Sequence, residues 1–182
     1  MSAPSIVGQF RIGERQLLEG GIARGQEMIR QLALNDFVLS RGLPSRLIEL
    51  EVKVNGELLT QYRCDGLIVS SPTGSTAYSL AAGGAIVSPD ADVMILTPIC
   101  PHTMSIRPVV VGLESEVQLR LLSPRLVAIL AADGQHQFEL GTGDSVTVRR
   151  SPHPVRLIQL EGYSFFSTLR QKFGWSGSHV EK

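Results

Sequence analysis

The stretch from 48 to 62 predicts an antiparallel β-hairpin, which any fold of this chain has to accommodate. In "IELEVKV" at 48–54, apolar residues alternate strictly with charged ones. A period of two is typical of a strand with one buried face. Asn55-Gly56 follows at once, and this dipeptide favours a tight hairpin turn because both residues tolerate positive φ. A return strand is therefore expected to run from Leu58 toward Tyr62.

Further strands are predicted along most of the chain. "GLIV" before residue 70 holds a short apolar run, and apolar residues alternate again at 117–121. "LVAILAADGQHQFEL" at 126–140 predicts a second hairpin with Asp133-Gly134 at its turn, and "GTGDSVTVRR" and "PVRLIQL" add one strand each. Many short strands joined by tight turns predict a mainly β protein of the α+β class, a β-sandwich with few helices.

Two helices are predicted. One is short, from Thr76 to Ala82, and ends at Gly83-Gly84. The other lies in "SFFSTLRQKFG" at 164–174, where the apolar residues fall on one helical stripe and Gly174 caps the end. The stripe needs a surface to cover, which is either the sandwich itself or a further domain. Residues 27–32 fit helix and strand equally well.

Composition excludes several classes of protein. The 182 residues carry 17 basic and 17 acidic side chains, so electrostatics gives no reason to expect nucleic acid or a membrane surface as the partner. No apolar run approaches the roughly 20 residues of a membrane helix, and the first residues do not read as a secretory signal. The two cysteines, Cys64 and Cys100, are too few and too far apart to predict a disulfide framework or a zinc site. We expect a cytoplasmic protein.

The junction "DGLIVSSPTGSTAYSLAAGG" at 65–84 passes from a strand through small and hydroxyl residues into a helix. It lacks the lysine of a Walker-type phosphate loop. Thr73, Ser75 and Thr76 are suited to cap the helix, and Gly74 lets a ligand or another backbone come close. Local chemistry leaves a capped turn and a ligand-binding loop as alternatives.

Two other pairs of polar residues can be interpreted either as ligand contacts or as local structure. In extended chain, Arg63 and Asp65 point to the same face and Cys64 to the other, which suits either recognition of a polar ligand or a cross-strand salt bridge. Asn35-Asp36 interrupts the apolar segment "LALNDFVLSRG", where it makes an Asx turn or meets a ligand. The four histidines show no metal-ligand spacing, and His136 is expected to be a surface residue.

Four stretches together resemble the NAD kinases in order and spacing. They are "LALNDFVLSRG", "YRCDGLIVSSPTGSTAYSLAAGGAIVSP", "LTPICPHTMSIRPVV" and "AADGQ". The resemblance extends from about Phe10 to Trp175. It implies phosphorylation of the 2′-hydroxyl of the adenosine ribose of NAD, giving NADP. Members of this family have an N-terminal α/β domain with a Gly-Gly-Asp-Gly motif and a C-terminal β-sandwich that supplies most of the NAD site.

The resemblance also implies a division of this chain. Residues 1–162 correspond to the β-sandwich NAD-binding domain, and residues 163–182 to a C-terminal helix and tail that pack on an N-terminal α/β domain. The Gly-Gly-Asp-Gly motif does not occur in the sequence. We therefore assign no catalytic residue and no metal ligand to it. The chain is expected to be a fragment of a full kinase or a half that needs a partner, and its abrupt start favours the fragment.

Site residues are implied by similarity, position by position. Asn35 and Asp36 match the pair that holds the adenosine ribose, and Asp65 matches the residue at the nicotinamide end. The remaining implied nucleotide contacts are Arg46, Arg63, Thr76, Ala77, Tyr78, Ser79, Leu80, Ala81, Cys100 and Gln135. Amides and carboxylates for hydroxyls, arginines for charge and an aromatic wall are groups that a dinucleotide site requires.

The family implies further partners. NAD is the substrate, ATP or polyphosphate is the phosphoryl donor, and a divalent metal ion of the Mg²⁺ type accompanies ATP. A homo-oligomer, either dimer or tetramer, is expected, with no nucleic-acid or membrane partner. The alternatives are a non-catalytic regulatory module that binds NAD or NADP, and a lipid kinase of the diacylglycerol type with the same two-domain plan. The latter matches less well, because "TGSTAY" and "LTPICPH" resemble the NAD branch.

Overall fold

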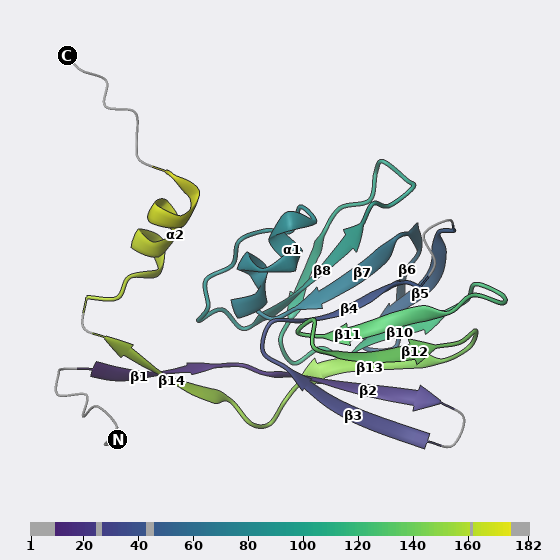
Figure 1. Ribbon diagram of the computed structural model, residues 1–182, viewed down its shortest axis with the longest axis horizontal. Coiled ribbons are helices and arrows are strands. Elements are labelled where there is room, and N and C mark those ends of the chain that lie inside the picture. Colours follow the sequence, from purple (N-terminus) through teal and green to yellow (C-terminus); the bar gives the residue numbers. More distant parts are fainter. Residues whose placement is uncertain (1–9, 25–26, 43–45, 161, 176–182) are drawn as a thin grey trace, which may run out of the picture. The chain divides into compact units, whose positions relative to one another are not determined.

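The structure is a computed structural model that describes residues 10–24, 27–42, 46–160 and 162–175 (Figure 1). It divides into two compact units, which are described separately. One unit comprises Arg15–Val155, and the other comprises the residues up to Glu14 together with those from Arg156 onward. None of the helices among the described residues has the length and apolar character needed to span a bilayer.

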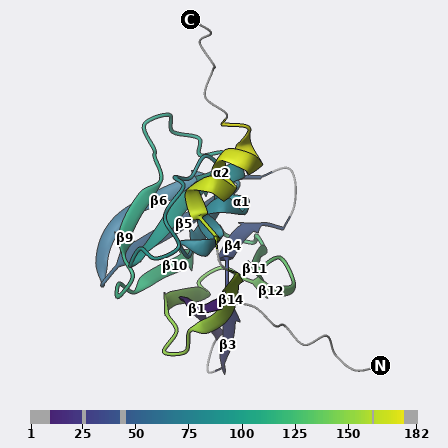
Figure 2. The same ribbon diagram turned by 90° about the vertical axis from the view of Figure 1, so that its left-hand side faces the viewer.

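The larger unit contains two six-stranded sheets (Figure 1 and Figure 2). The first has the order β3 (Glu27–Ala33), β2 (Leu18–Arg24), β13 (Ser145–Arg150), β10 (Val117–Leu121), β5 (Ile48–Val54) and β6 (Glu57–Cys64). The second has the order β12 (His136–Leu140), β11 (Ala128–Ala132), β4 (Asp36–Arg41), β7 (Gly66–Ser70), β8 (Val93–Ile99) and β9 (Val109–Gly112). Neighbouring strands are antiparallel in both sheets.

One hydrophobic core joins the inner faces of the two sheets. The alternating residues Leu50 and Val52 of β5 are completely buried, as is Leu119 of β10, their neighbour in the first sheet. Phe37 of β4 and Val69 of β7 enter the same cluster from the second sheet. The period of two thus places one row of each strand in the core. The predicted β-sandwich with few helices is confirmed.

Both predicted hairpin turns are present. Asn55 and Gly56 have φ values of 52° and 80°, and Asp133 and Gly134 have φ values of 49° and 67°. Positive φ at two consecutive residues matches the right-handed twist of the flanking strands. The ambiguous stretch at 27–32 belongs to strand β3, which pairs with β2 along its whole length.

The predicted helix at Thr76–Ala82 forms differently. A 3₁₀ helix, η1 (Thr73–Thr76), precedes a short helix α1 (Tyr78–Ala81), and Ala77 separates them with φ −100° and ψ −131°. The predicted side-chain cap is wrong, since neither helix has one. The Ser75 hydroxyl instead donates to the carbonyl of Pro72 at 2.7 Å and accepts the N–H of Val87 at 3.0 Å. These bonds fix the loop against a segment twelve residues further on.

The smaller unit is built from a two-stranded ribbon and a helix. β1 (Phe10–Arg15) pairs with β14 (Val155–Leu160). Helix α2 (Phe165–Phe173) begins after Ser164, whose hydroxyl accepts the N–H of Ser167 at 3.3 Å, and ends at Gly174 with φ 64°. This confirms the predicted helix and its glycine cap. Its packing on another domain stays a prediction.

Candidate functional site

Three segments that are distant in sequence meet at one end of the second sheet. β11, β4 and β7 are neighbours there. β4 begins at Asp36, β7 ends at Ser70 and β11 ends at Ala132. Because neighbouring strands are antiparallel, the start of β4 lies beside the ends of the other two. The β3–β4 turn, the bend after β7 and the β11–β12 turn therefore come together.

The carboxylate of Asp133 holds the β3–β4 turn in place. It accepts backbone N–H groups from Leu34 at 2.7 Å, Asn35 at 2.7 Å and Asp36 at 3.1 Å. The N–H of Asp133 in turn donates to the carbonyl of Asp36 at 3.0 Å. Among the described residues, the side chains of Asn35 and Asp36 make no hydrogen bond of their own, so the Asx turn that was one alternative for this pair is not formed.

Ser71 joins the bend after β7 to the same turn. Its hydroxyl donates to the carbonyl of Leu34 at 2.6 Å and accepts the N–H of Gly74 at 3.1 Å. Its own N–H donates to the carbonyl of Asn35 at 2.9 Å. A side chain at Gly74 would collide with the backbone of Asn35. The close approach expected of Gly74 is thus made by another stretch of backbone.

Asp36 is the buried carboxylate at the centre of this arrangement. Only 4% of the residue is exposed. Burial, and then the nearby charge of Asp133, raise the pKa of Asp36 from 3.8 to about 6. Its oxygens accept no hydrogen bond from the described residues, so they keep their full capacity to accept hydroxyl groups of a ligand.

Residues 76–81, which were predicted to line a pocket, include both exposed and buried side chains. Ala77, Tyr78 and Ala81 are exposed, and Tyr78 is 48% exposed. Ser79 is completely buried, and its hydroxyl pairs with that of Thr97 in β8 at 2.8 Å. Thr76 and Leu80 are partly buried. The side chain of Ser79 therefore joins α1 to the sheet, while the exposed members face solvent.

A second group of predicted residues lies at the opposite end of β7. Asp65 precedes this strand, and its carboxylate pairs with Arg41 Nε at 3.2 Å. Arg63 is exposed, so Arg41, from the neighbouring strand β4, is the salt-bridge partner of Asp65. Cys100 is exposed with φ 45°, and the N–H of Asp65 donates to the adjacent carbonyl of Ile99 at 3.0 Å.

The other two predicted residues lie in loops. Gln135 is exposed in the β11–β12 turn, beside Asp133. Arg46 is exposed and precedes β5, whose first residue Ile48 pairs with Cys64. The structure thus brings Asn35, Asp36 and Gln135 together. It sets Asp65 and Cys100 at the far end of β7, about 17 Å away along the five residue steps from Ser70 to Asp65.

Sequence reasoning missed three supporting residues. Asp133 was recognised only as a turn residue, Ser71 as part of a loop, and Arg41 not at all. The hydrogen bonds of Asp133 span 97 to 99 residues of sequence. No local sequence pattern predicts a contact over that separation. The available signal was the aspartate in the hairpin turn, because its carboxylate needs hydrogen-bond donors.

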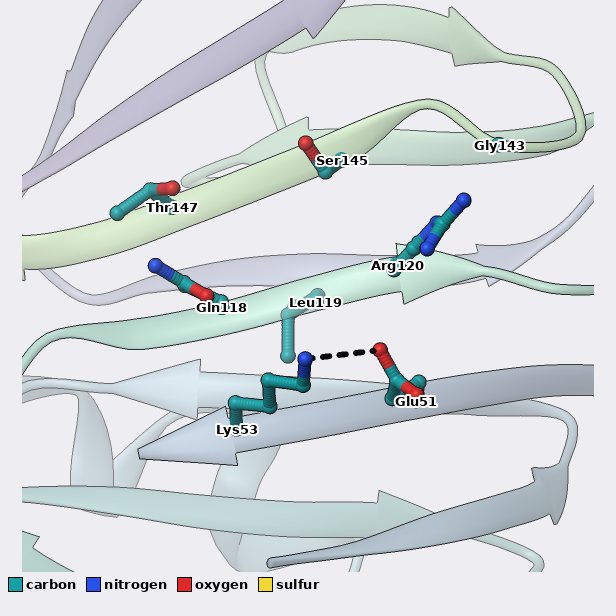
Figure 3. Close-up of a pocket in the computed structure, with 8 residues that line it drawn as sticks. All are labelled: Glu51, Lys53, Gln118, Leu119, Arg120, Gly143, Ser145 and Thr147. Atoms are coloured by element: carbon teal, nitrogen blue, oxygen red, sulfur yellow. Dashed lines mark ion pairs between the residues drawn. The ribbon is translucent and has the colours of Figure 1, made fainter. Parts of the chain in front are cut away.

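A separate depression of about 400 Å³ lies on the outer face of the first sheet (Figure 3). It is lined by polar side chains of β5, β10 and β13, and Lys53 Nζ pairs with Glu51 at 3.6 Å within it. None of the predicted site residues lines it. Among the described residues, no three His, Cys, Asp or Glu side chains are arranged to hold a metal ion.

Comparison with known proteins gives a consistent set of relatives. A sequence profile of the ATP-NAD kinase C-terminal domain matches residues 34–160. The chain is 47% identical to the NAD kinase of Moorella thermoacetica over 176 residues, which are 97% of this chain and 57% of that protein. It is 43% identical to the NAD kinase of Nitrosomonas eutropha over 172 residues, which are 94% of this chain and 58% of that protein.

Two solved structures share the fold. The crystal structure of yeast NADH kinase complexed with NADH has a TM-score of 0.87 and 29% identity, and the match covers 93% of this chain and 52% of that one. The NAD kinase from Archaeoglobus fulgidus in complex with ATP has a TM-score of 0.73 and 28% identity, and the match covers 90% of this chain and 59% of that one.

The two-sheet sandwich, with a buried carboxylate beside a hydroxyl-rich loop, has the fold of the ATP-NAD kinase C-terminal domain. The chain belongs to the NAD kinase family and matches its C-terminal domain. It spans a little over half the length of the curated relatives.

Proposed function

We propose that this chain is the NAD-binding part of an NAD kinase, in which NAD is held for ATP-dependent phosphorylation of its adenosine ribose 2′-hydroxyl to give NADP. The observation that carries this proposal is Asp36: a buried carboxylate without hydrogen-bond donors of its own, fixed through its backbone by Asp133. Such a group is suited to accept ribose hydroxyls. The NAD kinase relatives support the same assignment.

The remaining roles follow the geometry around Asp36. Asn35 offers its amide to the same ribose, and the exposed ring of Tyr78 offers a face for stacking against a base or nicotinamide. At the far end of β7, Asp65 and the backbone near Cys100 are placed to receive the other end of an extended dinucleotide. Arg46, Arg63 and Gln135 are exposed and free to move toward it.

This chain contributes positioning to the phosphoryl transfer. Transfer requires a base at the 2′-hydroxyl and neutralisation of phosphate charge, and we assign no catalytic residue here. The described residues do not form a metal site. Mg²⁺ would arrive with ATP, or with polyphosphate if that is the donor, and would neutralise charge on the phosphates.

The smaller unit has an apolar surface that we assign to a partner domain. Phe166 of α2 is 66% exposed and Trp175 is 52% exposed, while Ile12 and Leu160 of the ribbon are 62% and 64% exposed. Exposed apolar residues in this number mark an interaction surface. We propose that α2 packs on the N-terminal α/β domain that the longer relatives have room for; the tail at 176–182, which was predicted to join it, lies outside the described residues. A cytoplasmic homo-oligomer is part of the same proposal.

Calorimetric titration of NAD into the folded chain tests the proposal. We expect binding in the roughly micromolar-to-millimolar range, abolished or strongly weakened in Asp36→Asn. Addition of the N-terminal domain of a relative should then produce NADP from NAD and ATP. Absence of NAD binding by the folded, assembled protein would contradict the proposal. NAD binding without turnover in the completed protein would favour the alternative of a regulatory module. Phosphorylation of diacylglycerol by that protein would favour the alternative of a lipid kinase.

A further inference from the structure

Ser70, the last residue of β7, has a buried hydroxyl without a partner. The residue is completely buried, and its Oγ is the one side-chain nitrogen or oxygen in the described residues that is shielded from solvent and forms no hydrogen bond. The Asp36 oxygens also form none, but they keep some contact with solvent. Buried polar groups in folded proteins are nearly always paired, because an unpaired one loses its bonds to water without compensation. The position of this hydroxyl therefore calls for an acceptor nearby.

Strand register places that acceptor directly opposite. Ser70 of β7 and Asp36 of β4 are paired in the antiparallel ladder. Their neighbours Val69 and Phe37 both enter the core, so Ser70 and Asp36 share the outer face of the sheet. Side chains directly opposite on one face have Cβ atoms roughly 5 Å apart. A hydroxyl without an acceptor thus lies beside a carboxylate without a donor.

The surroundings leave this pair isolated from other donors. η1 and α1 contact β7, and the one titratable side chain in the segment 66–81 is that of Tyr78, which is 48% exposed. The charged neighbour of Asp36 is Asp133, whose own oxygens are taken by three backbone N–H groups. The Ser71 hydroxyl is engaged with Leu34 and Gly74. The Ser70 hydroxyl is unpaired and belongs to the residue directly opposite Asp36 in the ladder.

We propose that Ser70 is a positioning residue for Asp36: its hydroxyl donates to the Asp36 carboxylate when that group is ionised, and so holds it toward the ribose hydroxyls of the dinucleotide. The part that concerns the ribose rests on the proposed function. The contact between Ser70 and Asp36 does not. The Ser70 hydroxyl can rotate about χ1 toward the carboxylate, because it forms no other hydrogen bond.

The first test follows the carboxyl carbon of Asp36 by NMR during a pH titration of the NAD-free protein. A donor to the ionised form lowers a carboxyl pKa. Ser70→Ala should therefore raise the pKa of Asp36 further above about 6, by about half a pH unit or more. Ser70→Thr keeps the hydroxyl and should restore the wild-type titration. Ser123→Ala is the matched control: it removes another buried serine hydroxyl, one that accepts the N–H of Glu49 in the first sheet.

The second test measures NAD affinity at about neutral pH, with thermal unfolding in parallel. We expect about a tenfold loss of affinity in Ser70→Ala, the effect of one hydrogen bond to a charged group, with only a small fall in the melting temperature. An unchanged Asp36 titration in Ser70→Ala would overturn the inference, even where the wild-type protein binds NAD. A shifted titration in a wild-type background that binds no NAD would support the Ser70–Asp36 contact and overturn the proposed function.

Discussion

The backbone of Asn35 passes directly against the Cα atom of Gly74 and leaves no room there for a side chain. Ser71 closes the same contact, with its N–H bonded to the Asn35 carbonyl at 2.9 Å and its hydroxyl to the Gly74 N–H at 3.1 Å. Two motifs that are unrelated in sequence are therefore packed against each other, and disturbance of either one displaces the other.

Substitution of Gly74 should expose this dependence. Gly74→Ala forces the β3–β4 turn away, and we expect a loss of about 2–3 kcal/mol in the free energy of unfolding, because overpacking at a rigid backbone contact is costly. Gly112→Ala is the control, since a side chain there meets only the Ser115 hydroxyl at 3.9 Å. Urea denaturation of both variants measures the difference. Equal stabilities would show that the Asn35–Gly74 contact is not rigid.

Asp133 is expected to have a structural and an electrostatic effect. Asp133→Ala leaves three backbone N–H groups of the β3–β4 turn without their acceptor, which should cost roughly 2–4 kcal/mol of stability. Asp133→Asn retains one oxygen and tolerates the φ of 49° at this position, so its loss should be smaller. Since the Asp133 charge raises the pKa of Asp36, Asp133→Asn should also lower that pKa. An Asp36 titration that does not move in this variant would contradict the electrostatic part.

Stability should depend on pH through Asp36. Its pKa is raised to about 6 from 3.8, so folding favours the protonated form. The resulting stabilisation is complete below about pH 4 and is lost as pH rises through about 6. Asp36→Asn stays neutral, and it should be more stable than wild type by roughly 2–3 kcal/mol at about pH 8, with the gap closing toward about pH 4. Unfolding curves across this range measure it, and a gap independent of pH would refute the assignment.

The ion pair between Arg41 and Asp65 gives a way to separate structure from binding. Both side chains are partly exposed, so Arg41→Gln and Asp65→Asn should each cost less than about 1 kcal/mol of stability. If Asp65 binds the nicotinamide end, Asp65→Asn should weaken NAD binding more than Arg41→Gln does. Calorimetry and thermal unfolding of the two variants make the comparison. If the two variants bind NAD with equal affinity and lose equal stability, the role of Asp65 is to form the ion pair with Arg41 and not to bind the nicotinamide end.

Local sequence determined those elements that depend on neighbouring residues alone. Asn55-Gly56 and Asp133-Gly134 predicted their hairpins because positive φ is a property of the residues themselves. The stripe and glycine cap of α2 were equally readable. Strand β8 (Val93–Ile99) could not be predicted from local sequence, because it is buried on both faces and its apolar and polar residues do not alternate. The side-chain cap by Thr73, Ser75 or Thr76, one alternative for this loop, is not formed. The Ser75 hydroxyl is bonded instead to the carbonyl of Pro72 and the N–H of Val87.

The similarity of four motifs was sufficient to predict the family, but not how the motifs assemble. Only the strand order β11, β4, β7 brings Asp133, Asp36 and Ser70 together. The raised pKa of Asp36 comes from this packing, through burial and the charge of Asp133. Contacts across about a hundred residues are set by the fold as a whole, because burial and electrostatics depend on distance in space and not on separation along the chain.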